Sequence, residues 1–171
     1  MGRGGGGGGE ERAMAAREWL ESLMARVDGA STTAAEFAGS KAGNFDAIAM
    51  WGLKVLHVGG GRALCSLCVP KFLTGEDGYW HAGSIATVID DVGATAIMTA
   101  EGHIKVSVDF EISYFSPAKV NEEVEIDAKV VGHKGQLSVV LVEIRKQLSG
   151  ELVALGRQWM STPRMIIKGN L

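Results

Sequence analysis

Two neighbouring aspartates, Asp90 and Asp91, stand in the middle of a long apolar run and are the first candidates for chemistry. They are the only charged residues between Ala82 and Ala100. A membrane span is disfavoured, because one central aspartate in a spanning helix already costs about 2.5–3.5 kcal/mol. We expect instead a helix buried in protein, in which the carboxylates either form a site or serve as satisfied polar groups at a helix–helix contact.

The two aspartates point to different sides of this helix at 100° per residue. Asp91 joins a polar stripe that we expect to reach solvent, formed by Ser84, Thr87, Asp91, Thr95 and Thr99. Asp90 lies on a face of small residues, formed by Gly83, Ala86, Asp90, Gly93, Ala94 and Ile97. This face would let a ligand or another backbone come close. Gly93 costs the helix about 1 kcal/mol relative to alanine, so we expect a compensating contact.

The start of the helix is a second candidate site, where His81, Ala82 and Gly83 introduce the periodic region. The first turn of a helix carries unpaired N–H groups and a partial positive charge, so it can bind an anion or a developing oxyanion. Every helix has such an end, and the feature therefore needs support from the rest of the sequence.

The two cysteines, Cys65 and Cys68, have the C-x-x-C spacing of redox and zinc motifs, but no second pair follows. The surrounding run alternates like a strand and would point the two thiols to opposite faces. We expect plain buried cysteines in a reducing compartment, without a metal or redox cofactor.

The whole chain has the size and charge of one domain that does not bind nucleic acid. Its 171 residues carry 17 lysines and arginines against 20 aspartates and glutamates, a net charge of -3. Nucleic-acid binders normally show a basic balance. No signal peptide is recognised, so we expect an intracellular, cytoplasmic protein, with no organelle indicated.

The elements that position these residues follow from composition and periodicity. We expect a Gly-rich tail over 1–9, a helix over 10–29, a linker over 30–43, one domain over 44–165 and a C-terminal tail over 166–171. Within the domain, the long helix 81–101 stands among alternating strands, at 51–57, 62–70, 105–115, 123–131, 137–146 and 152–160. The pattern predicts an α+β fold, an antiparallel sheet wrapped around one long central helix.

The motif His81-Ala82-Gly83, with an acid nine positions after the histidine, resembles the His-Gly-Gly motif of hotdog-fold acyl-CoA thioesterases. The similarity is to the acyl-CoA thioesterase 13-like and phenylacetate-degradation thioesterases. It continues through 106–119 and 150–157 and covers about residues 45–160. The resemblance implies the hotdog fold and a hydrolase of fatty acid metabolism that splits acyl-CoA thioesters.

The resemblance also implies roles for individual residues. Asp90 matches the catalytic carboxylate, which acts as general base or as nucleophile. Ala82 belongs to the motif that also includes His81 and Gly83, and it matches the glycine whose N–H helps form the oxyanion hole. Ser107 matches a serine that holds the catalytic water. Strand alternation places Ser107 opposite the apolar face, so this role requires a bulge or a subunit contact. The implied CoA contacts are Tyr114, Ser116, Pro117, Lys119, His133 and Lys134.

One departure from the family pattern stands six residues before the motif histidine, where Gly75 replaces an asparagine. Loss of one polar group that positions the thioester or water can cost on the order of 10²–10³ in rate. A slower enzyme, an altered substrate and a non-catalytic acyl-CoA- or lipid-binding protein therefore remain open. A dehydratase acting on acyl carrier protein would depend on His81 as its catalytic histidine.

The helix geometry also predicts assembly. Asp90 lies seven residues beyond Gly83, about 10 Å along the helix axis. One helix cannot bring its own start and its own Asp90 to the same carbonyl carbon, so the site needs two chains across a two-fold axis. We expect a homodimer or homotetramer that takes acyl-CoA as its substrate.

Overall fold

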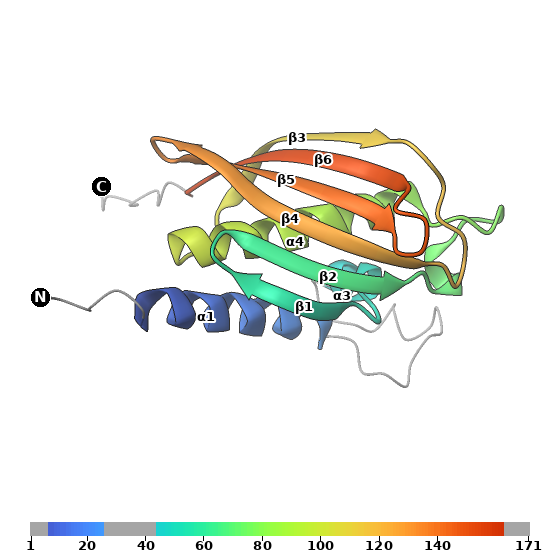
Figure 1. Cartoon of the computed structure of the whole chain (residues 1–171), viewed down its shortest axis with the longest axis horizontal. Helices are drawn as coiled ribbons and strands as arrows, with labels where there is room; N and C mark the ends of the chain where they lie inside the picture. Colours follow the sequence, from blue (N-terminus) through green and yellow to red (C-terminus); the bar gives the residue numbers. More distant parts are fainter. Residues whose placement is uncertain (1–6, 26–43, 163–171) are drawn as a thin grey trace, which may run out of the picture.

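The computed structural model describes residues 7–25 and 44–162 and shows a six-stranded antiparallel sheet curled around one long helix (Figure 1). The helical elements are α1 (Gly7–Met24), α3 (Asn44–Ala49), the 3-10 turn η1 (Lys71–Leu73) and α4 (Ala82–Glu101). The strands are β1 (Lys54–Gly59), β2 (Arg62–Cys68), β3 (Val106–Tyr114), β4 (Glu123–Lys134), β5 (Leu137–Lys146) and β6 (Leu152–Ser161). They lie side by side in the order β1-β2-β4-β5-β6-β3, and the predicted α+β fold is confirmed.

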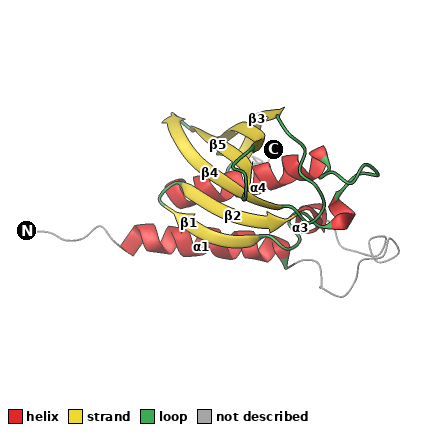
Figure 2. Ribbon diagram, turned by 45° about the vertical axis from the view of Figure 1, so that its right-hand side comes forward, coloured by secondary structure: helices red, strands yellow, loops and turns green. Residues whose placement is uncertain are grey.

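Helix α4 fills the concave side of the sheet (Figure 2) and ends where Gly102 takes a left-handed conformation with φ 83°. Val88, Ile89 and Val92 are buried there, as their apolar stripe predicts. The helix comes so close to β6 that a Cβ atom on Gly156 would overlap Cγ2 of Ile89. A glycine at this position therefore sets the depth at which the helix sits.

The polar stripe of α4 reaches solvent only in part, at the half-buried Thr87 and Asp91, so the expectation was wrong for its other three residues. Ser84, Thr95 and Thr99 are buried, and Asp91 is half-buried, because α1 and α3 also pack against α4. Two of the hydroxyls are satisfied within the helix, since Thr95 donates to the Asp91 carbonyl and Thr99 to the Ala96 carbonyl. Hydroxyl bonds of this kind make threonine acceptable in a buried helix.

Helix α1 begins at Gly7, earlier than the glycine-rich composition predicts, and ends at Met24. Its Ala16, Leu20 and Leu23 are buried, so the helix belongs to the same body as the sheet. The predicted linker 30–43 and the tail 166–171 lie outside the described residues.

Strand β3 forms one edge of the sheet and pairs with β6 alone among the strands described. Val106, Val108 and Phe110 are 47%, 56% and 38% exposed, so this edge is both open and apolar. The pairing register shifts between Ser107 and Asp109. A bulge of this kind reverses the alternation and turns Ser107 toward α4, on the same face as Phe110.

Cys65 and Cys68 lie on opposite faces of β2, as the alternation predicts. Cys65 is buried, and burial raises the pKa of its thiol to about 12. Cys68 is exposed at the end of the strand, so the expectation that both are buried was wrong for this residue. Within the ranges that the structure describes, no helix combines the length and apolarity that crossing a membrane requires.

Candidate active site

Three segments that are far apart in the sequence meet at the Asp90 carboxylate. Ser107 of β3 donates a hydrogen bond to Asp90 Oδ1 over 2.9 Å. The side-chain amide of Gln158, on β6, donates to the same oxygen and to Ser107 Oγ, the latter over 2.7 Å. Asp90 is half-buried, whereas Gln158 is completely buried. The structure therefore joins two predicted residues and adds a third that the sequence analysis missed.

The compensating contact expected at Gly93 is present, but it comes from the sheet. A Cβ atom at this position would lie 2.7 Å from Gln158 Oε1 and 3.2 Å from Val140 Cγ1. The oxygen of Gln158 is buried and has no hydrogen-bond partner among the described residues. Such an unsatisfied acceptor costs about 1–3 kcal/mol, so this glutamine is poorly suited to a purely structural role.

The start of α4 is capped by His81, whose Nδ1 accepts a hydrogen bond of 3.1 Å from the Gly83 N–H. A neutral imidazole that accepts at Nδ1 carries its proton on Nε2. The N–H of Gly83 is thus already engaged. The N–H groups of Ala82 and Ser84 have no acceptor in the part of the chain that is described, so Ala82, which lines the hollow beside the helix start, offers an available first-turn donor.

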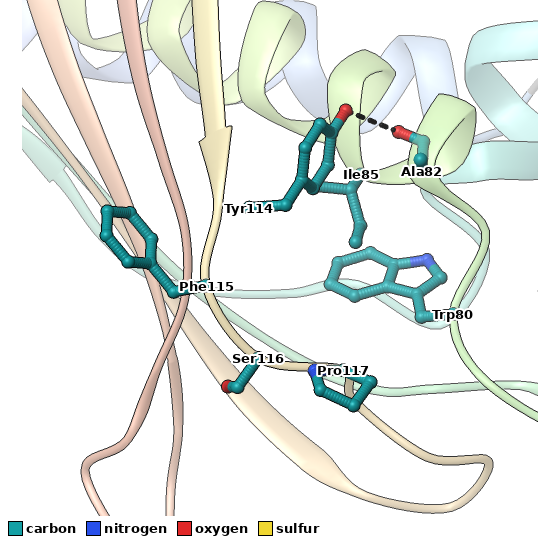
Figure 3. A pocket seen from close by; sticks show the side chains of 7 residues that line it. All are labelled: Trp80, Ala82, Ile85, Tyr114, Phe115, Ser116 and Pro117. Atoms are coloured by element: carbon teal, nitrogen blue, oxygen red, sulfur yellow. Dashed lines mark hydrogen bonds between the residues drawn. The ribbon is translucent and has the colours of Figure 1, made fainter.

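A hollow of about 320 Å³ opens beside this helix start (Figure 3). Its lining consists of Trp80, Ala82, Ile85, Tyr114, Phe115, Ser116 and Pro117. The Tyr114 hydroxyl points at the helix start and donates to the Ala82 carbonyl over 3.1 Å (Figure 3). Burial raises the pKa of Tyr114, so the phenol remains a neutral donor. Three of the predicted CoA contacts, Tyr114, Ser116 and Pro117, line this hollow. The ring of Trp80 also lines it, and this residue was not predicted from the sequence.

The other predicted CoA contacts lie elsewhere in the chain. Lys119 is exposed, and its backbone N–H donates to Glu122. His133 lies at the far end of α4, where its Nδ1 is 2.7 Å from Glu101 Oε1. Glu101 lies nineteen residues beyond Ala82, about 28 Å along the helix. The hairpin that carries His133 and Lys134 is therefore remote from the helix start of its own chain.

Glu101 is the centre of a second polar cluster, in which it is surrounded by the buried Lys105 and Ser138 and the exposed His133. Burial raises the pKa of Glu101, but hydrogen bonding from Ser138 and the charges of Lys105 and His133 outweigh this effect. The net result is a pKa below the usual value. This cluster ties the β4–β5 hairpin to the end of α4.

Gly75 lies in the loop before α4, where its N–H donates to the Tyr79 carbonyl over 2.9 Å. The left-handed conformation of this turn belongs to Gly78, with φ 77°. A Cβ atom on Gly75 would lie 2.9 Å from Asp77 Oδ1, an exposed side chain. The replaced asparagine position is therefore crowded by a group that can move.

No group of three or more histidine, cysteine, aspartate or glutamate side chains capable of holding a metal ion is found among residues 7–25 and 44–162. The arrangement that the structure does present is a carboxylate held by hydrogen-bond donors and, along the same helix, an open N–H beside an aromatic hollow. These groups suit the transfer of a proton and the binding of an oxyanion.

Comparison with known proteins gives this chemistry a family. The model of the thioesterase superfamily matches residues 77–153. Human acyl-coenzyme A thioesterase 13 is 32% identical over 119 residues, which cover 69% of this chain and 84% of the relative. The crystal structure of zebra fish thioesterase superfamily member 2 superposes with a TM-score of 0.70 at 26% identity, covering 86% of this chain and 97% of the other. A mutant structure of phenylacetic acid degradation protein PaaI from Thermus thermophilus gives a TM-score of 0.60 at 28% identity, covering 66% and 94%. The predicted hotdog fold is confirmed, and the chain belongs to the thioesterase superfamily.

Proposed function

We propose that the protein is an acyl-CoA thioesterase, which hydrolyses an acyl-CoA thioester to the free acid and CoA. Its relationship to human acyl-coenzyme A thioesterase 13 supports the class of substrate. The observation that carries the proposal is the Asp90 carboxylate, held at one oxygen by Ser107 on the face of α4 that looks toward the edge strand.

In the proposed reaction, Asp90 removes a proton from water, and the water oxygen bonds to the thioester carbonyl carbon. The carbonyl oxygen becomes an oxyanion, which the N–H of Ala82 and the positive end of α4 stabilise. The C–S bond then breaks, and the CoA thiolate takes up a proton. Direct attack by Asp90 on the carbonyl carbon is the second route open to the same geometry, and water would hydrolyse the resulting anhydride.

We infer that each site is shared by two chains. Asp90 lies eight residues beyond Ala82, about 12 Å along one helix, too far for both to act on the same carbonyl carbon. The open edge of β3 supports this inference, because its exposed Val106, Val108 and Phe110 would be an aggregation hazard unless another strand covered them. An antiparallel pairing of two β3 strands would form a homodimer, and two such pairs a homotetramer.

The hollow beside Ala82 is the proposed entry for the CoA end of the substrate. Its Tyr114, Ser116 and Pro117 follow the edge strand, next to the proposed seam. His133 and Lys134 would then act from the partner chain. A two-fold axis that sets the α4 helices antiparallel brings the far hairpin of one chain toward the helix start of the other.

The alternative is a protein that binds acyl-CoA without hydrolysing it, and Gly75 is the observation that favours it. The loop offers no side-chain amide at this position. A hydrolysis screen over short, long and aromatic acyl-CoAs, with free CoA as a binding control, separates the two functions. Release of CoA from any of these esters supports the thioesterase, whereas binding without release supports the alternative.

A further inference from the structure

We propose that Gln158 is a positioning residue for Asp90: its side-chain amide fixes one carboxylate oxygen so that the other faces the substrate. The inference rests on the proposed thioesterase function. Sequence alternation gives only a weak hint of it, because Gln158 stands in register with the inward-facing Ala154 and Met160 of β6.

The hydrogen bonds that the described residues make to the Asp90 carboxylate all end on Oδ1. Ser107 Oγ and Gln158 Nε2 both donate to this oxygen, and the amide also donates to Ser107. Two donors on one oxygen fix the rotation of the carboxylate. The second oxygen, Oδ2, is then the one that can take a proton from water or attack the thioester.

Packing alone does not explain why a glutamine occupies position 158. The residue is completely buried, yet its Oε1 has no hydrogen-bond partner within the described ranges. Leucine would occupy a similar volume without a buried unsatisfied acceptor, which destabilises a fold. Gly93, one turn beyond Asp90, leaves room for this oxygen, because a Cβ atom there would lie 2.7 Å away. The glycine at position 93 thus makes room for the amide oxygen of Gln158.

The chemistry of an amide suits this role. It donates a hydrogen bond without carrying a charge, and it does not titrate over the working range of an enzyme. A glutamate at the same place would repel Asp90, and an apolar residue would leave Oδ1 with Ser107 alone.

The test is Gln158→Leu, compared with Gln147→Leu in the exposed β5–β6 turn. We expect Gln158→Leu to unfold at the same denaturant concentration as the wild type or a higher one. Its kcat should fall by about 10- to 100-fold while KM changes little. Gln147→Leu should match the wild type in all of these measurements.

A structural role predicts the reverse, namely an unfolding midpoint that falls together with the activity. That result, or an unchanged kcat, would overturn the proposal. Gly93→Ala supplies an independent variant, since the new methyl displaces the Gln158 oxygen and should lower kcat while the helix gains propensity.

A measurement without substrate separates this inference from the proposed function. In the ¹H–¹⁵N NMR spectrum of the wild type, the Gln158 side-chain amide should exchange slowly with solvent and move on Asp90→Ala. If the wild type hydrolyses no acyl-CoA, the thioesterase proposal fails while this signal still reports the contact. A rapidly exchanging amide would refute the contact, whatever the activity.

Discussion

Ser107 and Asp90 are joined by a hydrogen bond of 2.9 Å, although one lies on the edge strand and the other on the central helix. The bond exists because the register of β3 shifts between Ser107 and Asp109, which turns the serine toward α4. The carboxylate is thus held immediately beside the edge that we propose as the subunit seam. A partner chain that covers this edge would bring its own helix start toward Asp90.

The role of Asp90, on α4, is tested by Asp90→Asn, with Asp109→Asn on the bulged strand β3 as the matched control. Asparagine keeps the volume but loses the base, so we expect kcat to fall by at least about 10²-fold. Asp109 is exposed, and its variant should retain the wild-type rate. Initial rates of CoA release from one good substrate decide the point, and equal losses in both variants would contradict the assignment.

The oxyanion donor is tested by Ala82→Pro against Ala82→Gly. Ala82 is the first residue of α4, where proline removes only the N–H and is well tolerated by a helix. His81 already has an extended conformation, with φ -67° and ψ 132°, as a residue before proline requires. We expect kcat to fall by about 10²–10³-fold in Ala82→Pro and to change little in Ala82→Gly, which keeps the N–H. Wild-type turnover by Ala82→Pro would exclude this N–H as the donor.

A shared site predicts complementation between two inactive chains. Co-expressed Asp90→Asn and Ala82→Pro chains should form mixed dimers in which one of the two sites has both intact groups. With random pairing, about a quarter of the wild-type rate should return. The assay is activity of the co-purified mixture against each variant alone. A site contained within one chain would give no recovery.

The close approach of α4 to the sheet is tested through Gly156→Ala. The added methyl would overlap Cγ2 of Ile89, and we expect a loss of about 1–3 kcal/mol in the free energy of unfolding. Gly132→Ala in β4 is the control, because its Cβ atom would lie an ordinary 3.7 Å from Val139 Cγ1. Urea unfolding of the two variants gives the comparison, and equal stabilities would show that the helix can shift without cost.

The sequence predicted the strands and the central helix well, because their alternation and helical periodicity report burial directly. It placed Ser107 on the wrong face, since a bulge adds one residue without leaving a compositional mark. Gln158 escaped notice because its partners, Asp90 and Ser107, are 68 and 51 residues away. The polar stripe of α4 was expected in solvent, because nothing in the helix itself shows that α1 and α3 pack against it. Short α3, at six residues, gave too little periodicity to be recognised.

The effect of the missing side-chain amide at position 75 on the rate is tested by Gly75→Asn, with Gly75→Ala as the control. Both variants add a Cβ atom 2.9 Å from Asp77 Oδ1, and the exposed Asp77 side chain must move equally for each. Only asparagine adds an amide that can orient the thioester or the water. One well-placed donor contributes about 2.7–4 kcal/mol in a rigid site, and a loop should deliver part of this, roughly a tenfold rise in kcat. Steady-state rates of the two variants give the answer.

A gain in asparagine but not in alanine supports a thioesterase weakened at this position. Equal rates in both mean that the amide has no role here, and a loss in asparagine alone means that the loop already positions the substrate by another group.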